Sequence, residues 1–243
     1  MVIKMKLMKI NWSRIVRLSL GGSMVAGILC GNLQRAEATV LAEYLFQSGN
    51  GASTDGAAGE DATAFVATGF TAGFSAGPVP TDLGGSPSIF VPAAQIPSTL
   101  STVDYFSFTV TPDAGQRLNL SGTAALGFDY SRDSTMTTEL NWAVRSSVDN
   151  YATDIATGST SGANALNTAS VNLSTAFDFQ DGVVEFRFLV WTTSSTGNGF
   201  FDNVVLNGTV VPVPEPVNVA LAAFGLCLAG VGVGRRFYLR SRA

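Results

Sequence analysis

The sequence predicts an all-β protein, an antiparallel β-sandwich of jelly-roll type, flanked by an N-terminal signal peptide and a single C-terminal transmembrane helix. Short runs of β-branched and aromatic residues alternate with clusters of Gly, Ser, Thr, Asn and Asp, and no stretch keeps a helical period. The clearest strand is 183–191, where apolar residues at alternate positions face a core while Glu185 and Arg187 face solvent. One face of this strand is therefore expected to be buried and the other exposed to solvent.

Eight further strands are expected on the same grounds. Turn-forming residues separate them, for example Asp181-Gly182 and Gly197-Asn198-Gly199. Many short strands with such spacers are typical of a sandwich, here over residues 39–211, and a closed barrel of the same strands is the alternative. The expected strands are 40–46, 62–70, 105–110, 117–120, 125–130, 141–145, 169–173 and 200–211.

The charge of residues 39–211 excludes several classes of function. This region holds 16 acidic side chains, four arginines and no lysine, a net charge of −12. Nucleic acid is excluded as a partner, because binding phosphates requires a basic surface. The chain has no histidine, and Cys30 and Cys227 both lie in the terminal segments. The common nucleophiles and bases are therefore missing, and only carboxylates are left for catalysis.

The N-terminal segment 1–38 has the three parts of a secretory signal peptide. Five basic residues lie within the first 17 positions, an apolar run follows from Leu18 to Cys30, and Ala36-Glu37-Ala38 has the small residues of a cleavage site. The apolar run of 13 residues is shorter than the roughly 20 that span a bilayer. We expect export through the secretion translocon and cleavage by signal peptidase after Ala38.

The C-terminal segment 212–243 combines a proline-rich stretch, an apolar run and basic residues. Prolines at 212, 214 and 216 keep the chain extended. The run 217–233 would reach about 26 Å as a helix, which is enough for a short membrane span. Arg235, Arg236 and two further arginines follow it and should stay in the cytoplasm, which places residues 39–211 outside the inner membrane.

These residues resemble the PEP-CTERM sorting signal of Gram-negative bacteria. The resemblance covers about the last 33 residues and rests on Val213-Pro214-Glu215-Pro216, the apolar span and the arginine cluster. It implies that a membrane-embedded exosortase recognises Pro214, Glu215 and Pro216 and processes the tail. The protein would be anchored transiently by the helix and then delivered to the cell surface or the extracellular biofilm matrix.

Residues from Tyr105 onward resemble a recurrent ectodomain of PEP-CTERM proteins. No enzymatic activity comes with this resemblance, which implies a sandwich whose last strand leads into the sorting tail. The leading hypothesis is thus a non-enzymatic structural component of the surface or matrix. The matching segments are 106–108, 128–130, 141–149, 186–188 and 201–208.

Two other hypotheses depend on individual side chains. Trp191 shares a strand face with Glu185 and Arg187 and could stack on sugar rings of an exopolysaccharide, whereas Trp142 is expected in the core. This reading makes the domain a carbohydrate-binding module. A carboxylate-dependent glycan hydrolase is the third hypothesis, with Glu60, Glu139 and Glu185 as the first acids to test.

Asp202 is the one candidate metal ligand. It stands near the start of the expected last strand, and carbohydrate-binding jelly rolls often have an aspartate near this point that helps to hold a structural Ca²⁺. The alternative is that its carboxylate only accepts hydrogen bonds from the local backbone of a turn.

Overall fold

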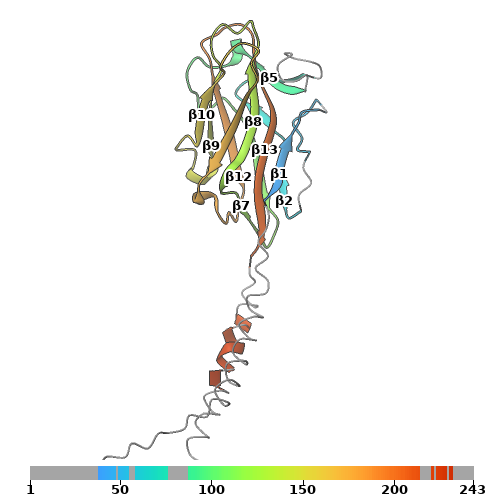
Figure 1. Ribbon diagram of the computed structural model, residues 1–243, viewed down its shortest axis with the longest axis vertical. Helices are drawn as coiled ribbons and strands as arrows, with labels where there is room; N and C mark the ends of the chain where they lie inside the picture. Colours follow the sequence, from blue (N-terminus) through green and yellow to red (C-terminus); the bar gives the residue numbers. More distant parts are fainter. Residues whose placement is uncertain are drawn as a thin grey trace, which may run out of the picture. The chain divides into compact units, whose positions relative to one another are not determined.

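The computed structural model describes residues 38–47, 49–54, 58–75, 87–213, 220–221, 223–228 and 230–231. Residues 38–213 of this set form two antiparallel β-sheets (Figure 1). The predicted antiparallel sandwich is therefore confirmed at the level of two sheets. Strand β13, which runs from Asn198 to Pro212, is the longest strand described and pairs with four others.

The first sheet has seven strands, and β13 lies at its centre. Its order is β11-β8-β13-β5-β4, while β1 and β7 also pair with β13. The bounds are β1 Thr39–Tyr44, β4 Gly73–Ser75, β5 Ser88–Pro92, β7 Gln116–Asn119, β8 Gly122–Arg132 and β11 Asn167–Leu173.

The second sheet has six strands in the order β10-β9-β12-β6-β2, with β3 also paired to β6. Three 3₁₀ turns, Ala93–Gln95 (η2), Ser147–Asp149 (η3) and Thr175–Phe177 (η4), belong to the connections. The strands are β2 Glu60–Ala62, β3 Val66–Thr68, β6 Tyr105–Pro112, β9 Asn141–Ser146, β10 Ala156–Ser159 and β12 Val184–Trp191.

The core between the sheets is rich in phenylalanine. Phe188 is fully buried, and its ring centroid lies 5.1 Å from that of Phe128 and 5.3 Å from that of Phe65, both in edge-to-face arrangements. Phe108 stacks on Phe186 at 5.5 Å. Pairs of this geometry add to the free energy gained from burial alone. The alternation predicted for 183–191 is confirmed, since the four apolar residues of that face are buried.

One expectation about the strands was wrong, and three strands were not predicted. The predicted strand 62–70 is two short strands, β2 and β3, because the Thr63 N–H bonds Thr109 O and the Phe65 N–H turns to Gly51 O. Strands β4, β5 and β10 were not predicted from the sequence. These strands are only three to five residues long, which is too short to show a clear alternation of apolar and polar residues.

Gly158 in β10 lies against the indole ring of Trp142. A Cβ at this position would stand 2.5 Å from Cζ2 of that ring. We expect Gly158→Ala to lower the free energy of unfolding by about 1–3 kcal/mol through overpacking. Guanidinium denaturation followed by tryptophan fluorescence measures this change. Gly182→Ala is the matched control, because a Cβ there meets nothing within 4 Å; equal effects of the two changes would contradict the packing.

The chain after β13 is described only in part. The Val213 N–H donates to Gly115 O, and residues 220–221, 223–228 and 230–231 are helical and exposed. Within the described residues no helix has the length and hydropathy needed to cross a membrane. The predicted cleavage residue Ala36 and the sorting residues Pro214, Glu215, Pro216, Arg235 and Arg236 lie outside the described residues.

Candidate binding face

The outward face of the second sheet gathers aromatic, charged and hydroxyl side chains. Because Phe106 and Phe108 of β6 and Phe186 and Phe188 of β12 point into the core, the residues between them point outward. We call this surface the β12 face. It comprises Tyr105, Ser107, Thr109, Asn141, Arg145, Tyr151, Glu185, Arg187 and Trp191.

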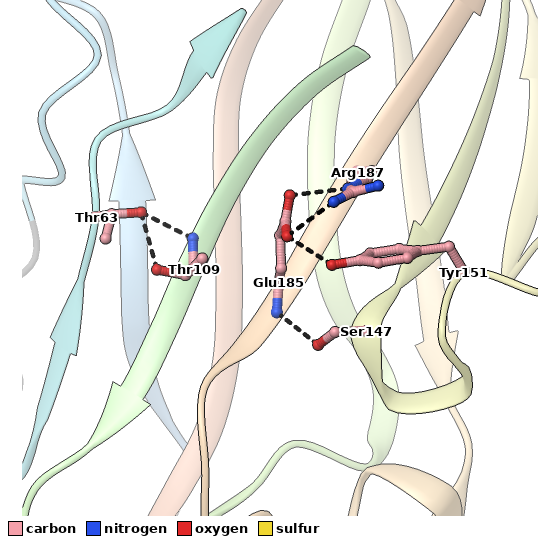
Figure 2. A network of polar contacts seen from close by, with 6 residues as sticks. All are labelled: Thr63, Thr109, Ser147, Tyr151, Glu185 and Arg187. Atoms are coloured by element: carbon pink, nitrogen blue, oxygen red, sulfur yellow. Dashed lines mark hydrogen bonds and ion pairs between the residues drawn. The ribbon is translucent and has the colours of Figure 1, made fainter. Parts of the chain in front are cut away.

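Arg187 is the centre of the β12 face. Its guanidinium carbon lies 4.3 Å from the ring centroid of Tyr105 and 3.6 Å from that of Tyr151. Cation–π attraction to both rings restrains a side chain that would otherwise be free to rotate. Arg187 Nε and Nη2 also donate to Glu185 at 2.9 and 3.2 Å (Figure 2). The two residues thus form an ion pair on the outward face of β12.

Hydrogen bonds hold Glu185 from several sides. Tyr151 donates its hydroxyl to Oε2 at 2.5 Å, and the Glu185 N–H donates to Ser147 Oγ at 2.9 Å (Figure 2). The adjacent strand β6 adds Thr109, whose N–H and hydroxyl lie 2.9 and 3.1 Å from Thr63 Oγ1. Hydrogen bonds thus restrain two separate groups of side chains on this face, one around Glu185 and one at Thr63 and Thr109.

A tight turn after β9 brings Tyr151 over Arg187. The N–H of Val148 donates to the Ser146 hydroxyl to start η3, and the Tyr151 N–H returns to Ser146 O at 2.8 Å. Asn150 and Tyr151 both have positive φ, 57° and 59°. Residues other than glycine seldom adopt this region, and such strain is concentrated at functional sites. Sequence alternation could not find Tyr151, because it lies outside any strand.

Arg145 of β9 lies beside Arg187 in register on the neighbouring strand. Its Nε donates to Asp154 at 2.6 Å and its Nη1 to Tyr151 O at 3.3 Å. Two of the four arginines of residues 39–211 are therefore adjacent on one face. Each has a carboxylate partner, so the face is locally neutral within an acidic domain.

The network shifts the pKa values of its members. Burial by itself would raise the pKa of Glu185, but the hydrogen bonds from Arg187 and Tyr151 outweigh it and hold that pKa below its ordinary value. Burial, together with the bond to Glu185, raises the pKa of Tyr151 to about 12. Glu185 is thus a carboxylate and Tyr151 a neutral donor across the physiological range.

We expect Tyr151→Phe to raise the pKa of Glu185, because the change removes one donor to the carboxylate. A lowered pKa stabilises the fold above the ordinary pKa of glutamate, and this contribution is lost as the pH falls through the lowered value. Carboxyl ¹³C NMR titration between pH 2 and 6 measures the shift. Tyr130→Phe is the control, since its hydroxyl donates to Ser159 O instead; an unmoved Glu185 titration in Tyr151→Phe would contradict the network.

Trp191 extends the face toward the end of β12. It is partly exposed and pairs with Asn141, whose Nδ2 lies 3.5 Å from Trp191 O. Between Trp191 and Arg187 on this face stands Leu189, buried although it points outward. Trp191 thus lies on the predicted face of the strand and is partly exposed. Trp142 is in the core as expected, with its ring 4.9 Å from Phe128.

Asp202 lies far from the β12 face, on the outward side of the first sheet. The last strand begins at Asn198, so Asp202 is inside β13 and not at its start as expected. It is fully buried, and its Oδ1 accepts the Asn203 N–H at 2.8 Å. Among the described residues there is no group of three or more acidic or cysteine side chains that could hold a metal ion.

The three glutamates considered for hydrolysis do not form a site together. Glu185 is bonded within the β12 face, Glu60 is buried on β2 next to Pro112, and Glu139 is exposed ahead of β9. Glycoside hydrolysis requires two facing carboxyl groups, one of them with a raised pKa. Glu185 has the opposite shift.

No protein-family model matches the chain, and no curated protein matches its sequence. Distant similarity exists to solved β-sandwich domains. The K1 cleaved adhesin domain of Lys-gingipain from Porphyromonas gingivalis W83 is 14% identical, with a TM-score of 0.38, and the match covers 70% of this chain and 97% of that one.

Two carbohydrate-binding modules show similarity of the same order. TmCBM61, solved in complex with β-1,4-galactotriose, is 11% identical with a TM-score of 0.36, over 69% of this chain and 93% of that one. A family 29 module from Piromyces equi, CBM29_1, is 10% identical with a TM-score of 0.34, over 71% and 91%. Values of this size assign the chain to no family.

Proposed function

We propose that the protein binds polysaccharide through the β12 face and has no catalytic activity. The observation that carries this proposal is the position of Arg187, held between the rings of Tyr105 and Tyr151 and bonded to Glu185. Aromatic rings offer apolar faces to the C–H surfaces of sugars, while fixed polar groups bind hydroxyls. Trp191 supplies a further ring on the same strand.

Neutral sugars fit this surface better than acidic ones. Arg187 and Arg145 are each paired with a carboxylate, so neither offers an unbalanced positive charge. The surrounding region carries a net charge of −12, which repels a polyanion. Hydroxyl groups, in contrast, can both donate to Glu185 and accept from the arginine N–H groups. The ligand class is therefore a neutral polysaccharide.

The charge state of Glu185 supports binding without hydrolysis at the β12 face. A general acid for glycosidic cleavage must hold its proton near neutral pH, which requires a raised pKa. Glu185, the carboxylate at the centre of the face, is kept ionised by Arg187 and Tyr151. The residues that would contact sugar are thus arranged to hold it and not to protonate it.

The terminal segments support an extracellular location for the proposed binding activity. The signal peptide 1–38 and the tail 212–243, with its resemblance to a PEP-CTERM signal, are the grounds for proposing export, processing by an exosortase and release to the surface or matrix. Mass spectrometry of the mature protein from its host tests this part. A mature chain that kept Arg235 to Arg242 and stayed in the inner membrane would refute it.

Affinity electrophoresis tests the binding proposal. Gels containing β-1,4-galactan, galactomannan, xyloglucan or the exopolysaccharide of the host are expected to retard the purified protein, and alginate, a polyuronate, is not. Bovine serum albumin run in the same gels controls for sieving. Absence of retardation by every neutral polymer, or retardation by alginate alone, would refute the proposal.

A further inference from the structure

Strand β11 forms an open edge of the first sheet. Among the described strands it pairs only with β8, so its other side presents N–H and C=O groups to no neighbouring strand of that set. In an antiparallel sheet, alternate residues of an edge strand direct these groups away from the sheet. Such a row can pair with a strand of another chain, and most proteins guard against that contact.

Most other edges of the two sheets are guarded in one of these ways within the described residues. Strands β3 and β4 are only three residues long, and β2 carries Asp61. On β1 the carbonyl oxygen of Glu43 accepts the Thr54 N–H at 2.7 Å, so the segment after β1 covers its free side. On β7 a bridge between Leu118 and Gln180 does the same.

Strand β11 has none of these protections. Its seven residues, Asn167–Leu173, include no charged side chain and no proline. Two of its outward side chains turn toward β8 instead of over the edge. The Thr168 hydroxyl donates to Asp129 at 2.6 Å, and Asn172 Oδ1 accepts the Ala124 N–H at 2.9 Å. The backbone of β11 is therefore left accessible to another strand.

The adjacent edge of the second sheet is uncharged as well. Strand β10 lies at the outer edge of that sheet, beside β9 (Figure 1). The Ser161 N–H donates to Asn167 Oδ1 at 3.1 Å, and the Tyr130 hydroxyl of β8 donates to Ser159 O at 3.2 Å. Strands β10 and β11 thus border the same side of the sandwich. The sequence 155–177, which contains both, has no Asp, Glu, Lys or Arg.

We propose that two copies of this chain pair through β11, antiparallel across a twofold axis, and join their first sheets into one. With the axis at Ser170, Thr168 of one copy lies opposite Asn172 of the other, and Ala169 lies opposite Val171. Residues directly opposite each other point to the same face of the sheet. The buried residues of β11 therefore continue the core side of the joined sheet, and its exposed residues continue the outward side.

An exposed apolar side chain fits the same register. Leu166 is 50% exposed and stands just before β11. Pairing about Ser170 sets it opposite Ser174 of the other copy, at the start of η4. The contact removes apolar surface from water at both ends of the paired strands, because the twofold axis repeats it.

Electrostatics favour a second copy at this edge. Residues 39–211 carry a net charge of −12, so two copies repel each other wherever acidic surfaces meet. Pairing through β11 sets no charged residue of that strand against another. Asp129, the acid bonded to Thr168, is separated from its counterpart by three strand spacings, roughly 14 Å or more, which exceeds the Debye length of about 8 Å at physiological salt.

One consequence rests on the proposed function, whereas the pairing itself does not. A twofold axis between antiparallel strands is perpendicular to the sheet, so the β12 faces of the two copies point to the same side. A long polysaccharide could then bind both faces and gain avidity. Strands β11 and β13 are parallel, since each is antiparallel to β8, so the two chains leave β13 at opposite ends of the pair. Pairing therefore belongs to released protein.

Sedimentation velocity of the full chain, from micromolar to millimolar concentration, tests the pairing. The wild type is expected to pass reversibly from monomer to dimer. Ser170→Lys places two like charges about 5 Å apart at the axis and should weaken the dimer about tenfold or more. Thr68→Lys is the matched control, because it adds the same charge at an exposed position of β3, and it should dimerise as the wild type does. The tail is identical in all three proteins.

A monomeric wild type at every concentration would overturn the proposal. Equal dimerisation of wild type and Ser170→Lys would also overturn it, because the copies would then associate elsewhere, for example through their tails. The same holds if Thr68→Lys weakened the dimer as much as Ser170→Lys.

Hydrogen–deuterium exchange of the wild type keeps the test decisive if a variant folds poorly. Amides of 167–173 should exchange more slowly at high than at low protein concentration, while those of 39–44 in β1 do not change. Exchange in 167–173 that is independent of concentration would overturn the pairing. Both measurements are made without polysaccharide, so their failure would leave the proposed binding at the β12 face untouched.

Discussion

Replacing Phe188 by alanine is expected to lower the free energy of unfolding by about 3–5 kcal/mol. Phe188 is fully buried at the centre of the aromatic core, with its ring against those of Phe65, Phe108 and Phe128. Its removal leaves a cavity that these large rings cannot fill by small movements. Guanidinium denaturation monitored by circular dichroism measures the loss.

Phe179→Ala is the matched control for this change. Phe179 is 58% exposed and lies in the connection before β12. Its removal should change the free energy of unfolding by no more than about 0.5 kcal/mol. If the two variants lost equal stability, the two-sheet core would not be centred on Phe188.

Arg187→Ala is expected to weaken polysaccharide binding at least tenfold, which corresponds to about 1.4 kcal/mol. The change removes the group that links Tyr105, Tyr151 and Glu185, so both rings lose their fixed position. Isothermal titration with the polysaccharide that gives the strongest retardation measures the loss. Because the side chain is partly exposed and its ion pair lies near solvent, the fold should keep most of its stability.

Two variants separate the role of the guanidinium from that of charge. Arg187→Lys keeps the charge but cannot form the two-pronged bond with Glu185 or lie over two rings, so it should also bind weakly. Arg117→Ala, at an exposed ion pair with Asp181 on another part of the domain, should bind as the wild type does. Equal affinity of Arg187→Ala and wild type would remove Arg187 from the site.

Alternation of residue types was enough to predict the parts of the fold that are built from long amphipathic strands. The pattern of 183–191 fixed both the buried side of β12 and the outward position of Glu185, Arg187 and Trp191. The same reasoning placed Trp142 in the core. In these strands one face is covered by the other sheet, so hydropathy at alternate positions reports burial directly.

The candidate site could be predicted only in part, because its geometry depends on a turn and on contacts between strands. Tyr151 reaches Arg187 because Asn150 and Tyr151, which follow η3, both have positive φ. No periodic pattern in the sequence predicts such a turn. Tyr105 meets Arg187 only because β6 pairs with β12. Burial of Asp202 was missed for another reason: the last strand begins at Asn198, two residues before the expected start, and Asp202 lies within it instead of in the turn that precedes a strand.

The measurement that tests the proposed function most directly is hydrogen–deuterium exchange of the protein with and without a retarding neutral polysaccharide. Binding at the β12 face predicts slower exchange in peptides covering 105–111, 141–151 and 185–191, with no change in 122–132 and 198–206 of the opposite sheet. Protection confined to the opposite sheet, or no protection at saturating polysaccharide, would contradict the account.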